Sequence, residues 1–388
     1  MPKQRIAGLP RNVFLAGLTS LFNDFSSEMI VSIFPAFFQS VLKSGAASLG
    51  LVEGFAEAAS NFIKIISGSV SDKINNRKWF AVAGYALSTV IRPFYALVGS
   101  VGGVLGLRFT DRIGKGLRDS PRDALISLST PPEELGRSFG FHRGMDTLGA
   151  VLGPLVAFLI LRSYPGAYNP VFITAFFIGI LGVISIILVQ EVRGAVKKKF
   201  TWKNLTNFSS RFKFYLLSTF IVSSAALPVA ILLLRVEDVG LAISYIPLFY
   251  SLYNIAYAAL SPIAGKVADT IGDRTVLSLG YFSLFIAYGL FALIPSLATI
   301  IFGFIVLGLY SGFTDAVSRS YAGRLIPDEL RGTSFGYLNA ATGLGALIAG
   351  IGGGYVWQNF SPITAIVSGS TILAAGIIIF FATQFRTD

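Results

Sequence analysis

Apolar stretches of about 20 residues recur along the whole chain, and this feature limits the folds that are open to it. A helix of about 20 apolar residues is long enough to cross the hydrocarbon core of a bilayer, which is about 30 Å thick. Of the residues, 53% are hydrophobic and 13% are charged, whereas about 25% are charged in a typical soluble protein. The sequence therefore excludes a water-soluble fold and predicts an integral membrane protein.

Proline, glycine and charged residues divide the chain into twelve expected membrane spans. These spans are expected near residues 13–42, 47–71, 79–98, 101–127, 136–161, 169–190, 214–234, 241–266, 275–295, 298–323, 332–357 and 362–384. The fourth span is rich in charge, and we retain it because the basic loops would otherwise alternate between the two sides of the membrane. The predicted fold class is an all-α integral membrane protein with twelve transmembrane helices.

The net charge of +11 comes mainly from basic residues in alternate loops. The positive-inside rule places these loops in the cytoplasm, together with both termini and residues 191–213, and the protein in the cell (inner) membrane. This distribution explains the charge without a nucleic-acid partner; a polybasic patch that binds anionic lipid or RNA is the alternative. The segment MPKQRIAGLPRN lacks the pattern of a cleavable signal peptide, so we expect the first span to be retained.

A repeat relates the parts of the chain on either side of the basic loop at 191–213. Two motifs recur 197 and 196 residues later: Gly68, Asp72 and Arg77 correspond to Gly265, Asp269 and Arg274, and Phe139, Gly140 and Gly149 to Phe335, Gly336 and Gly345. We therefore predict two six-helix halves, residues 1–190 and 214–388, joined by a cytoplasmic linker. Parallel repeats of this kind form a substrate site near the middle of the membrane, between the halves.

These motifs resemble those of the major facilitator superfamily over nearly the whole chain. The segments that begin at Gly68 and Gly265 resemble the two copies of the family's motif A, and Arg108 with Phe109 and Gly114 resembles motif B. The resemblance implies a transporter that works by alternating access between the two sides of the membrane.

The fifth span resembles motif C, which in this family marks proton-coupled antiporters. The run is Gly149-x-x-x-Gly153-Pro154-x-x-Ala157, with Ala157 where Gly is usual. The glycines and Pro154 are expected to allow close packing and a kink where this span meets its neighbour in the other half.

The two copies of motif A are predicted to form a conformational latch at the cytoplasmic helix ends, made of Gly68, Asp72, Arg77, Gly265, Asp269 and Arg274. The glycines would let two helices approach closely, and a carboxylate can satisfy the free amides at a helix start. By resemblance, Asp72 faces span 11 and Asp269 faces span 5, and together they close the cytoplasmic side in the outward-open state. The alternative is a loop that only follows the positive-inside rule.

The fourth span carries a charged face. Within an arc of about 140° on a helical projection lie Arg108, Asp111, Arg112, Lys115, Arg118, Asp119, Arg122 and Asp123. Each charge near the bilayer centre costs about 2.5–3.5 kcal/mol, so this face cannot contact lipid.

The charges in spans 1 to 5 balance. Eight bases (Lys64, Arg92, Arg108, Arg112, Lys115, Arg118, Arg122 and Arg143) stand against eight acids (Asp24, Glu28, Glu53, Glu57, Asp111, Asp119, Asp123 and Asp146). The balance argues against a simple anion trap and predicts an ion-pair network, part of it structural.

Four ionisable residues in the first and fifth spans are predicted to couple transport to protons. Asp24 and Glu28, one turn apart in the first span, are the first candidates, because span 1 carboxylates have this role in similar antiporters. His142 and Asp146 form an i, i+4 pair that could relay a proton, and hydrogen-bonded packing is the alternative for His142.

Substrate binding is predicted for residues of both halves: Arg108, Arg112, Lys115, Glu53 and Glu57 in the first, and Tyr253, Asn254, Asp315 and Arg319 in the second. We expect the first half to couple transport to protons and the second half to supply apolar and aromatic contacts. The tyrosines could equally serve helix packing.

The sequence thus predicts a proton-coupled secondary active transporter that exports a small organic solute, such as a drug-like compound, a metabolite or a siderophore. It contains no ATP-binding loop of the G-x-x-x-x-G-K-S/T type, so the energy must come from a gradient. Export of a divalent metal or its chelate is one alternative, and a non-transporting sensor on the same fold is another. An enzyme is not expected, because no hydroxyl nucleophile is suitably placed near the single His.

The expected partners follow from the same composition. The chain has no Cys, which excludes disulfides and thiolate metal sites. We expect no cofactor and no resident metal, and as partners a small-molecule substrate, protons and the lipid bilayer, with no nucleic acid. We expect a monomer.

Overall fold

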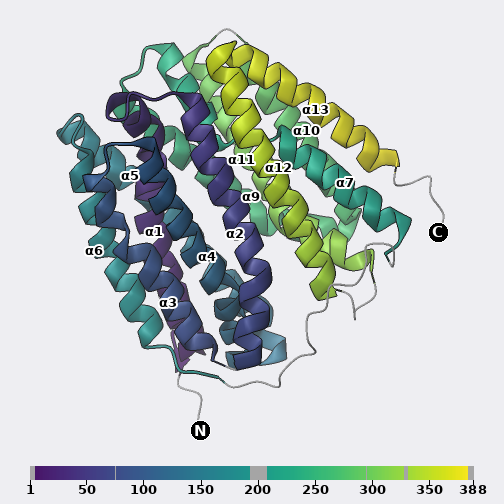
Figure 1. The fold of residues 1–388 in the computed structure, drawn as a ribbon. Helices are drawn as coiled ribbons and strands as arrows, with labels where there is room; N and C mark the ends of the chain where they lie inside the picture. Colours follow the sequence, from purple (N-terminus) through teal and green to yellow (C-terminus); the bar gives the residue numbers. More distant parts are fainter. Residues whose placement is uncertain (1–4, 75, 193–207, 294, 327–330, 383–388) are drawn as a thin grey trace. The chain divides into compact units, whose positions relative to one another are not determined.

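The computed structural model describes residues 5–74, 76–192, 208–293, 295–326 and 331–382 (Figure 1). A short hairpin precedes the helices, in which β1 (Arg5–Ile6) pairs antiparallel with β2 (Leu9–Pro10). Ala7 and Gly8, which connect the two strands, both have positive φ, as the tight two-residue turns of hairpins require.

The first half of the chain contains six long helices. They are α1 (Arg11–Ser40), α2 (Ala46–Ile74), α3 (Arg77–Val90), α4 (Val101–Ser129), α5 (Leu135–Ser163) and α6 (Tyr168–Ile187). The 3-10 helix η1 (Arg92–Leu97) continues α3, and η2 (Pro132–Glu134) precedes α5. Pro93 explains the change at the end of α3, because proline has no amide hydrogen for the helical ladder.

The second half contains α7 (Ser210–Ala225), α8 (Val229–Leu232), η4 (Leu233–Val239), η5 (Ile243–Tyr245), α9 (Ile246–Ile271), α10 (Asp273–Ala292), α11 (Leu297–Arg324), α12 (Arg331–Asn359) and α13 (Pro362–Ala382). α7, α8 and η4 follow one another as a single interrupted span. Counted in this way, the described chain has twelve spans, and the predicted fold class is confirmed. The predicted span near 214–234 is interrupted at residues 226–228, where Pro228 precedes α8.

Eight helices in the described part of the chain are long and apolar enough to cross a membrane. α1, α2, α4 and α9 are not among these eight. The fourth predicted span, retained from the sequence in spite of its charges, is nevertheless a continuous helix of 29 residues.

The chain forms two compact units, residues 1–42 with 62–199, and residues 43–61 with 200–388. α2 therefore contributes its first part to the unit that contains α7–α13 and its second part to the unit that contains the other early helices. The predicted domain limits at residues 190 and 214 follow the order of the chain and stay a prediction.

Glycine contacts in the two halves repeat each other. A Cβ built on Gly149 of α5 would lie 2.4 Å from the carbonyl oxygen of Leu21 in α1, so this position needs glycine. A Cβ built on Gly345 of α12 would lie 2.5 Å from the Cβ of Ser223 in α7. The close neighbour of Gly149 is α1 of the same half, and the expected contact of the fifth span with the other half stays a prediction.

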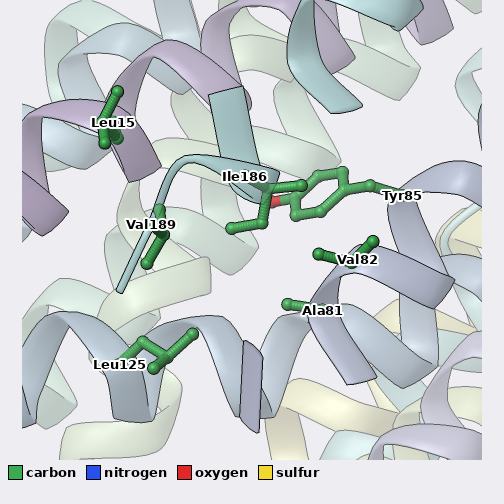
Figure 2. Packing of buried hydrophobic residues seen from close by; sticks show 7 residues of the cluster. All are labelled: Leu15, Ala81, Val82, Tyr85, Leu125, Ile186 and Val189. Atoms are coloured by element: carbon green, nitrogen blue, oxygen red, sulfur yellow. The ribbon is translucent and has the colours of Figure 1, made fainter. Parts of the chain in front are cut away.

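A buried apolar cluster joins α1, α3, α4 and the end of α6 (Figure 2). Its members are Leu15, Ala81, Val82, Tyr85, Leu125, Ile186 and Val189. The ring of Tyr85 lies against Ile186 in this view. Because lipid supplies no hydrophobic drive between helices, such close packing is what holds them together beside the charged residues.

Candidate functional site

Four residues of the charged face of α4 are buried. Arg108, Asp111, Arg112 and Arg118 are between 3% and 8% exposed. Ser100 caps the start of α4 by accepting a hydrogen bond from the amide of Gly103, at 3.2 Å. Buried charges at membrane depth need partners, and the structure provides them unevenly.

Asp119 and Asp123 are paired with bases. Asp119 lies 3.4 Å from the Nζ of Lys64 in α2 and 3.5 Å from the Nη1 of Arg122. Arg122 also donates to the same oxygen of Asp123 through Nε and Nη2, both at 2.9 Å. This part of α4 is the ion-pair network that charge balance predicts.

Asp111 is shared by two guanidinium groups at long distances. Its Oδ2 lies 3.4 Å from the Nη1 of Arg108 and 3.7 Å from the Nε of Arg112. Charge-assisted hydrogen bonds of this kind are normally about 2.7–2.9 Å long. In the described part of the chain, the buried Nε of Arg112 has no hydrogen-bond partner.

Arg92 and Arg118 are held by uncharged groups. Arg92, which is 2% exposed, donates to the Oγ of Ser26 at 2.6 Å and to the Oδ1 of Asn23 at 2.9 Å. Arg118 donates to the Oγ of Ser88 at 2.8 Å and lies over the ring of Tyr85, with its Cζ 4.6 Å from the ring centre.

A pair of carboxyl groups lies between α1 and α5. The side chains of Asp24 and Asp146 lie close enough to interact electrostatically. Asp24 accepts from the Nδ2 of Asn23 at 2.9 Å, and Asp146 accepts from the Oγ of Ser20 at 2.6 Å and lies 3.3 Å from the Nη1 of Arg143. Two of the four predicted proton-coupling residues are thus brought together.

The other two predicted proton-coupling residues lie near this pair. His142 is 5% exposed, and its Nε2 has no hydrogen-bond partner among the described residues. Glu28 lies one turn after Asp24 in α1, and its Cβ would be 3.2 Å from a Cβ built on Gly153 of α5. Asp24, Glu28 and Asp146 thus lie where α1 meets α5, whereas no contact of His142 with α1 is described.

The predicted substrate residues of the second half form a stacked tyrosine row on α9. Tyr250 stacks on Tyr253 with ring centres 5.9 Å apart, and Tyr253 stacks on Tyr257 at 6.4 Å. Tyr257 donates to the Oδ2 of Asp315 in α11 at 2.6 Å. Tyr253 and Ser311 of α11 share a hydrogen bond of 2.8 Å. Asn254 is buried.

The remaining predicted substrate residues belong to both compact units. Arg319 of α11 is exposed. Glu53 and Glu57 belong to the part of α2 that lies in the unit with α7–α13, while Arg108, Arg112 and Lys115 lie in the other unit. Asn61 donates to the Oε1 of Glu57 at 3.1 Å.

The latch residues are described only in part. The surroundings of Gly68 and the side chain of Asp72 lie outside what the structure describes. Asp269 pairs with Arg324 of α11 at 3.2 Å. No described atom lies within 4 Å of a Cβ built on Gly265, and the close helix approach expected there stays a prediction.

The two arginines of the latch differ in burial. Arg77, at the start of α3, is buried. Arg274 is the second residue of α10 and donates to the carbonyl oxygen of Phe381 at 3.0 Å.

Glu191 caps α3, a contact that sequence reasoning missed. Its carboxylate accepts from the amides of Arg77 at 3.3 Å and Lys78 at 2.7 Å. A carboxylate stabilises the free amides and the positive end of a helix dipole in this way. The signal in the sequence is a single acid at the start of an otherwise basic linker.

No group of three or more His, Cys, Asp or Glu side chains in the described ranges is arranged to hold a metal ion. Twelve helices with ionisable groups buried inside them define a multi-pass membrane protein of the kind that moves ions or solutes.

The family model of the Major Facilitator Superfamily matches residues 16–234 and 214–388. The chain belongs to this superfamily and is a secondary transporter, not an enzyme.

The chain is similar to known proteins over very different lengths. It is 33% identical over 385 residues to an uncharacterized MFS-type transporter of Methanocaldococcus jannaschii, covering 96% of this chain and 95% of the relative. It is 27% identical over 161 residues to the multi-drug resistance efflux pump PmrA of Streptococcus pneumoniae, covering 40% of each. The crystal structure of the nucleoside transporter NupG matches with a TM-score of 0.77 at 14% identity, over 97% of this chain and 100% of that one, which shows the shared fold.

Proposed function

We propose that the protein is a proton-coupled antiporter that exports a small organic solute by alternating access. In this proposal it lies in the cell membrane with both termini in the cytoplasm, as the distribution of basic residues indicates. The resemblance of the fifth span to motif C and the partial similarity to an efflux pump both support export.

The carboxyl pair of Asp24 and Asp146 carries the proposal. Two buried carboxyl groups that come into hydrogen-bonding contact need a proton on one of them, because an ionised carboxylate can only accept. Loss of that proton leaves two negative charges in contact in a medium of low dielectric constant, where their repulsion is strong. Protonation therefore changes the force between α1 and α5, which is what coupling a proton to a helix movement requires.

The other groups around the pair suit a proton site. Ser20 and Asn23 donate hydrogen bonds to it, and Arg143, which is half exposed, provides a positive charge at 3.3 Å from Asp146. These donors favour the ionised form, whereas burial and the second carboxyl group favour the protonated form. A site with opposed influences of this kind can load and release a proton during a transport cycle.

The test uses proteoliposomes that contain the purified protein and a pH-sensitive dye. Candidate solutes are first selected by thermal shift at two pH values, since a ligand that binds only the folded protein raises its melting temperature. Addition of such a solute outside the vesicles should then raise the internal pH, because the solute enters as protons leave.

Two variants make the test specific. Asp24→Asn should abolish the solute-driven pH change and retain solute exchange at equal pH. Glu133→Gln is the control, because it removes an exposed acid before α5, and it should behave as wild type. Solute-driven pH change that persists in an Asp24→Asn, Asp146→Asn double variant would remove the proposed proton site. Solute movement with no pH change in the wild type would contradict antiport with protons.

A further inference from the structure

We propose that the transported solute carries an anionic group, a carboxylate or a phosphate, and that Arg112 binds it. The inference rests on the proposed function, because it names the substrate class of that transporter. It is argued from how the buried guanidinium groups of α4 are paired.

Arg112 is buried without a good partner. Its side chain is 10% exposed, and its ionic contact is the 3.7 Å approach of Nε to Asp111. Its Nε makes no hydrogen bond to any described residue. Arg122 of the same helix, with 14% exposure, instead makes two contacts of 2.9 Å to Asp123. The difference between them is therefore pairing, not burial.

Asp111 lies among several arginines. Its carboxylate lies in the field of four guanidinium groups, those of Arg92, Arg108, Arg112 and Arg118. Two of the four, Arg92 and Arg118, have hydrogen-bond partners without charge. Pairing along α4 is thus uneven, because Asp119 and Asp123 lie with Lys64 and Arg122 while Arg112 has the single long contact with Asp111.

An anion is the ligand that such a site favours. A buried cation without a close counter-charge is costly, and an anionic ligand removes that cost, whereas a cationic one increases it. The guanidinium group presents its donors as a planar fork that matches two oxygens of a carboxylate or phosphate. The long contact with Asp111 is the weak interaction that a ligand with two oxygens would replace.

The experiment measures binding of four small probes to the purified full-length protein, by calorimetry and thermal unfolding at constant ionic strength. Benzoate and phenylphosphonate carry an anionic group on a phenyl ring, benzamide is neutral, and benzylammonium is cationic. We expect the two anions to bind and to raise the melting temperature, and the other two to bind at least about 10-fold more weakly, the effect of one charge-assisted hydrogen bond.

Three variants locate the site. Arg112→Gln should weaken the binding of the anions at least about 10-fold, and Arg112→Lys should weaken it several-fold, because a point charge does not reproduce the fork. Arg162→Gln, which removes an exposed arginine in the last turn of α5, should leave the affinity unchanged. If Arg112→Gln does not fold, Arg112→Lys decides the question.

Anion affinity that is equal in the wild type and both Arg112 variants would overturn the inference, as would equal binding of benzoate and benzamide or no binding of either anion. These measurements need no pH gradient. Their failure therefore leaves proton-coupled transport open, and absence of solute-driven proton movement leaves anion binding at Arg112 open.

Discussion

Arg92 connects three helices through uncharged partners. It extends from the start of η1 to Ser26 and Asn23 of α1, and Ser26 in turn donates to the carbonyl oxygen of Ala175 in α6. The amide of Asn23 is fixed by this contact, because its oxygen accepts from Arg92 while its nitrogen donates to Asp24. Arg92 thus positions, through Asn23, one member of the carboxyl pair.

Replacement of Arg92 by Gln should destabilise the protein clearly. It removes two charge-assisted hydrogen bonds and leaves buried acceptors on Asn23 and Ser26, and loss of such bonds costs about 1.5–3 kcal/mol each. Thermal unfolding of the purified protein should show a lower melting temperature than for Arg162→Gln, which removes an exposed arginine. Equal melting temperatures for the two variants would show that Arg92 does not hold the helices together.

At the residue scale, the sequence predicted which residue types would be buried but not how each would be paired. The charged face of α4 follows from helical periodicity, so Arg108, Asp111 and Arg112 were expected together. The pairing of Asp24 with Asp146 depends on how α1 and α5 are rotated about their axes, which hydropathy does not contain. The cap of α3 by Glu191 was missed for the same reason, since 113 residues separate it from Lys78.

Among the helices, α2 is the one that belongs to both compact units. Its first part packs on α12 so closely that a Cβ built on Gly350 would lie 2.4 Å from the carbonyl oxygen of Gly50 and 2.8 Å from the Cα of Gly54. Small residues allow this backbone contact between helices, as is common in membrane proteins. A side chain at Gly350 would have to push the two helices apart.

Gly350→Leu is therefore expected to lower the stability by about 1–3 kcal/mol, the usual cost of overpacking, and to impair transport. Gly352→Leu is the matched control on the same helix, because no described atom lies within 4 Å of a Cβ built there. The measurements are thermal unfolding and solute exchange in proteoliposomes. Equal effects of the two substitutions would show that the α2–α12 contact does not limit either property.

Helix positions were predictable because length and apolar character are local properties of the sequence. α4 is an exception, because its charges keep it out of the apolar helices and it was predicted from the alternation of the basic loops. The interruptions were not predicted: α3 continues as η1 beyond Val90, and the span that begins with α7 breaks before Pro228. Both interruptions lie at prolines, which mark a possible break but do not decide whether the helix kinks, changes type or ends.

Across the whole molecule, the two halves share their packing but differ in their chemistry. Gly149 and Gly345 make equivalent close contacts, α5 with α1 and α12 with α7, as the internal repeat implies. Asp119 and Asp315 are also repeat mates, 196 residues apart. Asp119, however, lies between Lys64 and Arg122, whereas Asp315 accepts a hydrogen bond from Tyr257. This difference supports the expected division in which the first half couples transport to protons and the second half supplies apolar and aromatic contacts to the solute.

The division predicts different results for one substitution in each half. Tyr257→Phe removes the hydroxyl that donates to Asp315 at 2.6 Å but keeps the ring and its stacking on Tyr253. We expect it to change the apparent affinity for the solute by about tenfold or more, the effect of one hydrogen bond to a charged group. The number of protons moved per solute should stay the same, because the carboxyl pair on α1 and α5 is intact.

Asp24→Asn should give the opposite result, with solute exchange at equal pH retained and proton movement lost. Both quantities are measured in the same proteoliposomes, by uptake of labelled solute and by the internal dye. Since the hydroxyl of Tyr257 donates to Asp315, a change in proton stoichiometry in Tyr257→Phe would place coupling at that carboxylate. Both halves of the chain would then take part in proton coupling, which the charge content of the two halves assigns to the first half alone.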